Sequence, residues 1–331
     1  MRIGLLGAGH LGKIHLKCIL ATSCWKLAGF YDPSDTHAES AVKQYAAHRF
    51  DTVDELLQAV DAVDIVTPTP SHFELAARAL EAGKHVFIEK PVTETLAEGK
   101  KLLEMASGTG LKVQVGHVER FNPAFTALKG MDLNPMFIES HRLSVFQPRG
   151  TEVSVILDLM IHDLDLVLHL VRSELINLSA SGVAVLSDTP DIANVRLEFA
   201  NGAVANLTAS RISLKQMRKM RLFQPDHYLS LDFLDKNAQI VRLYDQEAPN
   251  LPPQEQLMAF ETNQGTKWLH LQMPDSEPVN AIQRELETFY ESIENNSTPV
   301  VSLEDGYRAL KVAHEILEAI EMRKGAAHLD A

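Results

Sequence analysis

The sequence predicts an α/β protein in which a doubly wound parallel sheet comes first and an α+β domain with an open, largely antiparallel sheet follows. Three observations carry this prediction. A glycine-rich turn joins a strand pattern to a helix pattern at the start of the chain. Short apolar runs then alternate with helical patterns as far as residue 120, and longer β-type segments follow. We therefore expect one domain over residues 1–120 and a second over residues 121–331.

The first strand and the first helix are joined by the most informative motif in the chain. Residues 3–6 form an apolar run that leads directly into Gly7-x-Gly9-x-x-Gly12, and a helical pattern follows. In a dinucleotide-binding Rossmann domain these glycines permit the tight turn, the approach of the pyrophosphate and the close packing of helix on strand. The positive end of that helix faces the phosphates. We expect cofactor contacts from Gly7, Gly9, His10, Leu11 and Gly12.

The rest of the first domain repeats the alternation of strand and helix. Two helices are predicted to begin at capping boxes, Thr52-Val53-Asp54-Glu55 and Ser71-His72-Phe73-Glu74. The predicted strands cover residues 25–31, 63–66, 85–88 and 112–115, and the predicted helices cover 36–45, a short segment from 52, 71–81 and 96–106.

Beyond residue 120 the pattern is mostly of β type. Asn201-Gly202 between two alternating runs is a strong hairpin signal, and residues 245–265 read as a long loop. We expect strands at 137–145, 194–199, 204–207, 220–223, 228–233 and 240–243, and helices at 123–128, 155–170, 281–293 and 303–322. An open sheet face must be covered, so we expect a homodimer or a homotetramer.

Composition excludes several classes of partner. Lys and Arg number 31 against 44 Asp and Glu, a net charge of −13, which argues against a nucleic-acid partner. The two cysteines indicate no disulfide framework and a reducing, cytoplasmic location. The N-terminus lacks the pattern of a signal peptide. The apolar stretch 153–171 carries three Asp and two His, so we expect no membrane span and no membrane partner.

Asp32 follows the second predicted strand, 20 residues after Gly12. A carboxylate at this place accepts hydrogen bonds from the adenosine ribose and repels the 2′-phosphate of NADP. Because no Arg follows closely, we expect NAD rather than NADP. The alternative is that Asp32 only begins the turn before Pro33.

Lys90 lies in Glu89-Lys90-Pro91, directly after the strand predicted at 85–88. Ligands of open α/β sheets bind beyond the carboxyl ends of the strands, so Lys90 is expected where nicotinamide and substrate meet. Its ammonium would stabilise a developing alkoxide. The alternative is an ordinary surface lysine.

Asp158 and His162 are four residues apart on the predicted helix 155–170, which places them on one face. His162 would act as general base, with Asp158 orienting it and stabilising its charged form. The alternative is a buried pair that satisfies itself in the core. We expect no metal site, because no further Cys or His cluster has ligand spacing.

Several residues near the ends of predicted strands are further candidates. Thr67, Pro68 and His72 are expected to line the cofactor groove together with Glu89 and Lys90. His117 ends the last strand of the first domain and is expected to contact nicotinamide or substrate. Candidate anchors for an anionic group of the substrate, each with ordinary surface charge as the alternative, are Arg142, Arg149 and Arg211.

Together these motifs resemble the glucose–fructose oxidoreductase/inositol dehydrogenase/MocA family of NAD(P)-dependent oxidoreductases. The resemblance rests on the glycine turn, Asp32, Thr67-Pro68, Glu89-Lys90-Pro91 and Asp158-x-x-x-His162. It implies a catalytic trio of Lys90, Asp158 and His162. It also implies oligomerisation through the open sheet and a sugar or cyclitol substrate.

Within the family, residues 116–123, 158–163 and 209–211 are similar to members that oxidise the 3-hydroxyl of UDP-N-acetylglucosamine on the route to the diamino sugars of lipid A. The resemblance thus implies an NAD-dependent oxidation of a sugar or nucleotide-sugar hydroxyl. Two alternatives stay open. One is the NAD(P)H-dependent reduction of a keto sugar, imine or tetrapyrrole, and the other is a non-catalytic NAD-binding regulatory protein.

Overall fold

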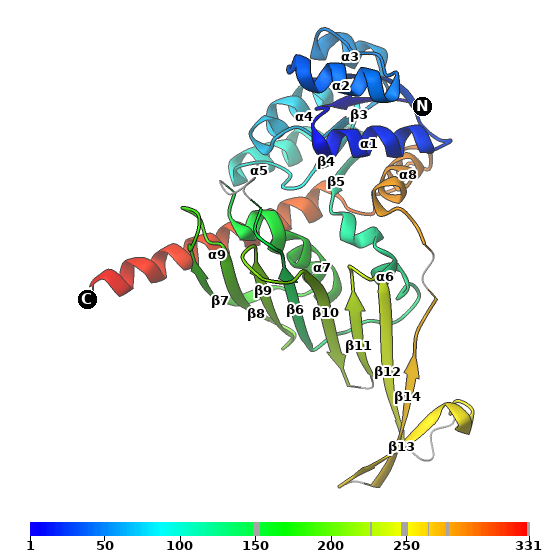
Figure 1. The fold of residues 1–331 in the computed structure, drawn as a ribbon, viewed down its shortest axis with the longest axis vertical. Coiled ribbons are helices and arrows are strands. Elements are labelled where there is room, and N and C mark those ends of the chain that lie inside the picture. The colour runs from blue at the N-terminus through cyan, green and yellow to red at the C-terminus, as the bar shows by residue number, and fades with distance from the viewer. Residues whose placement is uncertain (148–152, 226, 246–250, 264, 276–277, 330–331) are drawn as a thin grey trace. The chain divides into compact units, whose positions relative to one another are not determined.

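A computed structural model describes residues 1–147, 153–225, 227–245, 251–263, 265–275 and 278–329 (Figure 1). The chain divides into two compact units. The first unit comprises Met1–Phe121 and Val279–Lys311, and the second comprises Asn122–Pro278 and Val312–Ala331. The division after residue 121 lies one residue from the expected domain boundary. Residues 279–311, which we expected in the second domain, belong to the first unit.

The first unit is built on a five-stranded parallel sheet, as the alternating pattern predicts. The strand order is β2-β1-β3-β4-β5. Its strands are β1 (Arg2–Leu6), β2 (Lys26–Tyr31), β3 (Ala62–Ile65), β4 (His85–Glu89) and β5 (Val113–Gly116). The chain leaves β1 in one direction to reach β2 and leaves β3 in the other to reach β4. Such a reversal opens a crevice at the carboxyl ends of the strands.

Helices cover both faces of this sheet, with α1 and α8 on one side and α4 and α5 on the other (Figure 1). The predicted capping box at Thr52 is partly formed, because its hydroxyl accepts from the Glu55 N–H. The capping box predicted at Ser71 is wrong. Its hydroxyl donates to Thr67 and to the Pro68 carbonyl, and a short 3₁₀ turn precedes the helix. The helical elements are α1 (His10–Ala21), α2 (Asp35–Tyr45), α3 (Val53–Ala59), η1 (Thr69–Ser71), α4 (His72–Glu81), α5 (Leu96–Ala106), η2 (Val118–Phe121) and α8 (Ala281–Glu294).

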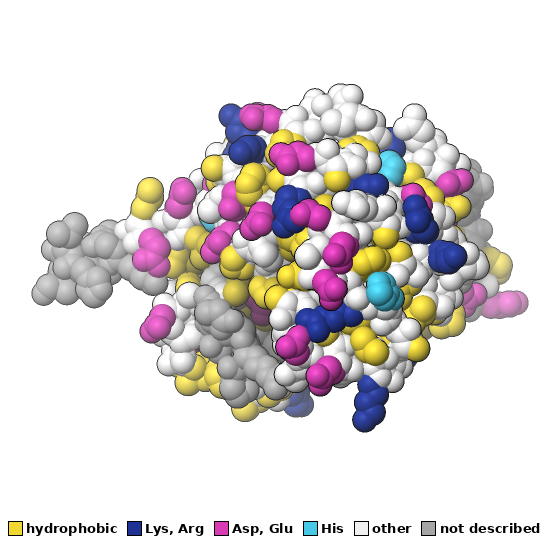
Figure 2. Space-filling model, turned by 90° about the horizontal axis from the view of Figure 1, so that it is seen from above, with side chains coloured by type: hydrophobic (Ala, Val, Ile, Leu, Met, Phe, Trp, Pro, Cys, Tyr) yellow, Lys and Arg dark blue, Asp and Glu magenta, His cyan; other side chains and the backbone are white. Residues whose placement is uncertain are grey.

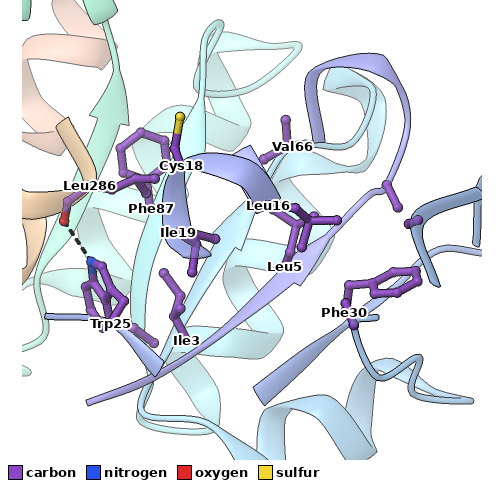
Figure 3. Packing of buried hydrophobic residues seen from close by; sticks show 14 of the residues in the cluster. Ile3, Leu5, Leu16, Cys18, Ile19, Trp25, Phe30, Val66, Phe87 and Leu286 are labelled. Atoms are coloured by element: carbon purple, nitrogen blue, oxygen red, sulfur yellow. Dashed lines mark hydrogen bonds between the residues drawn. The ribbon is translucent and has the colours of Figure 1, made fainter. Parts of the chain in front are cut away.

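Helix α8 packs in the first unit beside α1, and its Leu286 and Phe289 share one core cluster with Leu16 and Ile19 of α1. Phe289 of α8 packs on Phe87 of β4, with ring centroids 6.0 Å apart. The Trp25 indole donates a hydrogen bond of 2.8 Å to the Leu286 carbonyl (Figure 3). The Gln114 amide of β5 donates to the Glu285 carbonyl at 2.7 Å. A segment far along the chain therefore completes the apolar cover over β4 and β5.

The second unit is built on a nine-stranded mixed sheet in which only β6 and β9 pair in parallel. The strand order is β13-β14-β12-β11-β10-β6-β9-β8-β7. The strands are β6 (Phe137–Leu143), β7 (Leu175–Val183), β8 (Ile192–Phe199), β9 (Val204–Ser210), β10 (Met217–Gln224), β11 (His227–Asp232), β12 (Asn237–Asp245), β13 (Leu257–Thr262) and β14 (Gly265–Gln272). The expected hairpin at Asn201-Gly202 joins β8 to β9. The long loop expected at 245–265 is wrong in part, because residues 257–262 form β13. Strands β7 and β14 were not expected.

The helical elements of this unit lie mostly where the sequence predicts them. The predicted helix at 155–170 begins as a π-helical segment, η3 (Ile156–Met160), and continues as α7 (Ile161–Val171). The remaining helical elements are α6 (Pro123–Thr126) and η4 (Gln254–Gln256), together with α9 (Leu303–Leu329), which crosses from the first unit into the second at residue 311.

Candidate active site

The glycine turn after β1 has a different physical reason for each of its three glycines. Gly7 has φ +97°, a conformation that L side chains rarely adopt. A Cβ on Gly12 would lie 2.0 Å from the Gly7 carbonyl oxygen, so α1 could not approach β1 with any other residue there. A Cβ on Gly9 would meet nothing closer than His37, at 4.0 Å. The packing of the protein therefore does not require glycine at position 9. A ligand that approaches the backbone there would require it.

A pocket of about 670 Å³ lies at the carboxyl ends of β1, β2 and β3, the crevice where the strand order reverses. Of the expected cofactor residues, those in its wall are Gly7, Gly9, His10, Leu11, Asp32, Thr67 and Pro68. Ser71, in the segment 67–72 that was expected along the groove, also lines the pocket. The wall further holds residues that sequence reasoning missed, namely Tyr31, Pro33, Ser34, His37, Val53, Val66, Glu74, Leu75 and Arg78. Pro33, Ser34 and Val66 directly follow strand ends, and position after a parallel strand is the signal that could have found these three.

The first turn of α1 lines this pocket and is suited to bind an anion. Gly9 is the N-cap residue and supplies no side-chain cap, and the first turn carries no acidic side chain. The first backbone N–H groups of a helix have no partner within the helix, and the helix dipole favours negative charge at this end. The pyrophosphate of a dinucleotide meets both requirements.

Asp32 is buried at the end of β2, and two backbone N–H groups hold its carboxylate. Ala8 donates to Oδ2 at 2.7 Å and Ser34 donates to Oδ1 at 2.8 Å. These bonds fix the carboxylate beside the glycine turn, and each oxygen keeps a lone pair for a ribose hydroxyl. The ring of His37, half exposed, lies 3.5 Å from Oδ2.

Arg49 is a neighbour of Asp32 that the sequence does not reveal. A bridge between Phe30 and Arg49 brings residues 48–50 beside the end of β2. The Arg49 guanidinium donates to the Asp32 carbonyl at 3.0 Å and lies 2.8 Å from the Asp35 carboxylate. The cation is therefore held by two acceptors of this chain, and the Asp32 carboxylate still opposes a 2′-phosphate.

The segment Glu89-Lys90-Pro91 follows β4, and the Lys90–Pro91 peptide bond is cis. The Glu89 carboxylate does not line the pocket. It turns into the sheet, where Oε2 accepts the Lys90 N–H at 3.1 Å and Oε1 lies 3.2 Å from His15. His72 is also buried, with Nδ1 2.9 Å from the Pro91 carbonyl and Nε2 2.8 Å from the Thr67 carbonyl. Burial lowers the pKa of His72. Glu89 and His72 thus hold the main chain on either side of Lys90.

His117 lies directly after β5 and is almost fully buried. It begins the turn that leads into η2, as expected for the last strand end of the first domain. Its contact with nicotinamide or substrate stays a prediction.

Asp158 and His162 lie in the second unit, on the π-helical segment η3 and on the first turn of α7. Single-turn π segments occur often at functional sites, because the wider turn changes the direction of side chains. Lys90 belongs to the first unit, and Asp158 and His162 belong to the second, so the trio is a prediction about residues of different units. Its joint action stays a prediction.

Two of the arginines considered as substrate anchors are buried in ion pairs. Arg142 on β6 donates two hydrogen bonds to Asp163 on α7, from Nε at 3.0 Å and from Nη2 at 2.8 Å. Arg211 lies 3.2 Å from the Asp191 carboxylate and donates to the carbonyl of Val153. Neither is a surface charge. Arg149 lies outside the described residues.

Further expectations concern metals, membranes and charge. Within the described part of the chain, no three His, Cys, Asp or Glu side chains are arranged to hold a metal ion. Of the helices described, none combines the length and the apolar composition of a bilayer span. On the face shown in Figure 2, the visible Lys and Arg side chains lie among Asp and Glu, without a basic patch among the described residues.

Comparison with known proteins agrees with this geometry. Residues 1–117 match the family described as an oxidoreductase family with an NAD-binding Rossmann fold. Residues 137–223 match the family described as the GFO/IDH/MocA C-terminal domain.

Individual relatives extend the match to nearly the whole chain. The UDP-N-acetylglucosamine 3-dehydrogenase of Acidithiobacillus ferrooxidans is 41% identical over 253 residues, which cover 76% of this chain and 80% of that enzyme. A solved structure of that enzyme superposes with a TM-score of 0.87 at 36% identity, covering 97% of this chain and 98% of the other. The NAD(+)-dependent scyllo-inositol 2-dehydrogenase of Bacillus subtilis is 30% identical over 233 residues, 64% of this chain and 68% of that enzyme.

Proposed function

Since this chain belongs to the glucose–fructose oxidoreductase/inositol dehydrogenase/MocA family of NAD-binding oxidoreductases, we propose that it oxidises a hydroxyl group of a sugar or nucleotide sugar. One observation carries the proposal. The pocket at the reversal of the strand order combines a glycine turn, a bare helix N-terminus and a buried carboxylate, the three features that NAD recognition requires.

The cofactor fits the residues that are present. Gly9 and the first turn of α1 would hold the pyrophosphate, and Asp32 would accept the ribose hydroxyls. Bound NAD would supply a hydride acceptor. The remaining chemistry falls to the side chains of this chain, which must bind the substrate hydroxyl and remove its proton.

We assign the removal of the proton to His162 and its orientation to Asp158. An imidazole is the side chain whose usual pKa lies close to neutral pH, so it can accept a proton there without prior activation. A carboxylate on the preceding turn stabilises the imidazolium that results. Asp163 follows His162 on α7 and pairs with Arg142 on β6, and this ion pair fixes the helix to the sheet.

We assign the stabilisation of the reacting oxygen to Lys90. A developing alkoxide is stabilised by a cation that is already in place, because no reorganisation is then needed during the reaction. Glu89 and His72 hold the main chain on both sides of Lys90, which provides such preorganisation.

For the substrate, we propose UDP-N-acetylglucosamine with oxidation at its 3-hydroxyl. The support is the 41% identity to the dehydrogenase of Acidithiobacillus ferrooxidans that carries this activity in its name. The test is to incubate the purified protein with NAD and a panel of UDP-sugars and free cyclitols. The formation of NADH is followed by its absorbance at about 340 nm. Activity with cyclitols alone would contradict the substrate, and a failure with every member would contradict the oxidation itself.

We also propose a homodimer or homotetramer that uses the open face of the nine-stranded sheet. Phe137, Phe223 and Tyr228 form a row of rings on that face of β6, β10 and β11, with centroids 5.7 and 4.8 Å apart. The alternate residues Ile138 and Leu222 are buried on the other face. Light scattering of the wild type and of Phe223→Glu would test the proposal, since a charge on this row should dissociate the oligomer.

A cytoplasmic location completes the proposal. Both cysteines, Cys18 and Cys24, are free thiols. Free thiols on a chain without disulfides suit a reducing compartment.

A further inference from the structure

The first unit buries three ionisable side chains beside one another in its core. His15 on α1 and Asp64 on β3 are fully buried, and Glu89 at the end of β4 is 7% exposed. His15 Nδ1 lies 2.9 Å from Asp64 Oδ2, and Nε2 lies 3.2 Å from Glu89 Oε1. The imidazole therefore sits between two carboxylates, and its two nitrogens face one each.

This arrangement favours a charged imidazole, although burial also raises the pKa of Asp64. Burial lowers the pKa of His15, but the two carboxylates outweigh burial and raise this pKa well above its ordinary value. Burial raises the pKa of Glu89, but the close approach and charge of His15 and the charge of Lys90 outweigh burial and lower this pKa. Glu89 is thereby held as a carboxylate inside the sheet.

The neighbouring strand makes room for this carboxylate. Glu89 of β4 is paired in register with Gly116 of β5. A Cβ on Gly116 would lie 2.8 Å from both Cδ and Oε1 of Glu89, closer than real contacts allow. Here glycine leaves the space that the Glu89 carboxylate occupies.

The carboxylate so fixed acts on the next residue. Its Oε2 accepts the backbone N–H of Lys90 at 3.1 Å. On the far side of the segment, His72 approaches the Pro91 carbonyl at 2.9 Å. The path Asp64–His15–Glu89 thus ends on the main chain of Lys90, within one unit of the molecule.

We propose that His15, Asp64 and Glu89 are a buried ion cluster that positions Lys90, with the His15 cation holding Glu89 ionised and Glu89 fixing the Lys90 main chain. The three are positioning residues and touch neither substrate nor cofactor. The inference rests on the proposed role of Lys90. A buried ion pair is weak evidence for stability, because apolar residues of similar volume often serve a core as well. Control of a neighbouring residue is a reason to retain the charges.

The test uses Glu89→Gln in the full-length enzyme, since glutamine keeps the shape of the side chain and removes its charge. We expect kcat to fall by about tenfold, with the dissociation constant of NADH within about twofold of the wild type. Unchanged turnover in a folded E89Q variant would overturn the proposal. The matched control is His85→Gln, which changes a half-buried histidine at the opposite end of β4 and should leave kcat unchanged.

A double-mutant cycle separates positioning from a general defect. If the cluster acts through Lys90, E89Q added to Lys90→Ala should cause no further loss of kcat, because neighbours in one network are not additive. An additive loss would overturn the proposal. Should E89Q fail to fold, His15→Gln removes the cation, and the same loss and the same lack of additivity are expected.

The two proposals fail differently. Wild-type turnover in K90A would contradict the role of Lys90 itself. A severe loss in K90A with normal turnover in E89Q and H15Q would contradict only the positioning cluster.

Discussion

The two units both bury charged side chains, but they balance the charges differently. In the second unit, Arg142 and Asp163 pair one to one through two hydrogen bonds that join a strand to a helix. In the first unit, one imidazole stands between the carboxylates of Asp64 and Glu89, so that two negative charges share one positive charge.

The comparison indicates a different role for the ion pair and for the cluster. A matched bidentate pair satisfies itself and holds two elements together, which is a structural role. The unmatched cluster places the Glu89 carboxylate at a strand end, where it accepts the backbone N–H of Lys90. This agrees with the proposal that the cluster positions that lysine. The following predictions test this contrast, from the largest effect to the smallest.

Arg142→Met should destabilise the protein by about 3–5 kcal/mol, because it leaves the Asp163 carboxylate buried without its cation. Urea denaturation measures the change. The control is Arg221→Met on β10, whose ion pair with Glu139 is partly exposed and should be worth less than about 1 kcal/mol. Equal losses in the two variants would contradict a structural role for the buried pair.

Lys90→Ala and His162→Ala should each lower kcat by about a hundredfold or more, roughly 2.7 kcal/mol in the barrier, with the NADH affinity nearly unchanged. Steady-state kinetics and NADH fluorescence measure the two quantities. Lys100→Ala, on the exposed side of α5, is the control and should have normal turnover. Near-native turnover in either variant would remove that residue from the mechanism.

The stability of the wild type should fall as the pH rises above about 6.5, the usual pKa of histidine. The native state keeps the proton on His15, whose pKa is raised, whereas the unfolded chain releases it. The native state then binds more protons, so the free energy of unfolding decreases by up to about 1.4 kcal/mol per pH unit until the folded pKa is passed. Denaturation at a series of pH values would show this slope, and it should be absent in H15Q. The same slope in both proteins would contradict a charged His15.

Asp32→Ala should weaken NAD binding by about tenfold, near 1.4 kcal/mol, and should reduce discrimination against NADP. Titration with both cofactors measures the change. Glu39→Ala is the matched control, because that carboxylate is exposed on α2 and does not line the pocket. Unchanged affinities in the Asp32 variant would contradict the ribose contact.

Much of the first unit could be predicted from local sequence. The glycine turn, Asp32 and the alternation of strand and helix depend on spacings within a few dozen residues, and the parallel sheet confirms the alternation. The Ser71 capping box failed because the hydroxyl bonds back to Thr67 and Pro68, a competing use that the motif does not reveal.

The second unit was harder to predict. Strand β7 carries mostly exposed side chains, and β13 is largely exposed, so neither shows the apolar alternation that marks a strand. The pattern predicts α8 as a helix, but its place in the first unit depends on contacts with distant residues, such as that of Phe289 with Phe87.

Short motifs with local geometry were enough to predict the cofactor, the family and a catalytic trio, and the comparisons confirm the first two. Only the tertiary structure decided that Arg49 lies beside Asp32, that Arg142 and Arg211 are buried in ion pairs, and that His15 stands between Asp64 and Glu89. These partners are separated by 17 to 74 positions in the chain, as their numbers show. Strand order and register bring them together, and no spacing in the sequence encodes either.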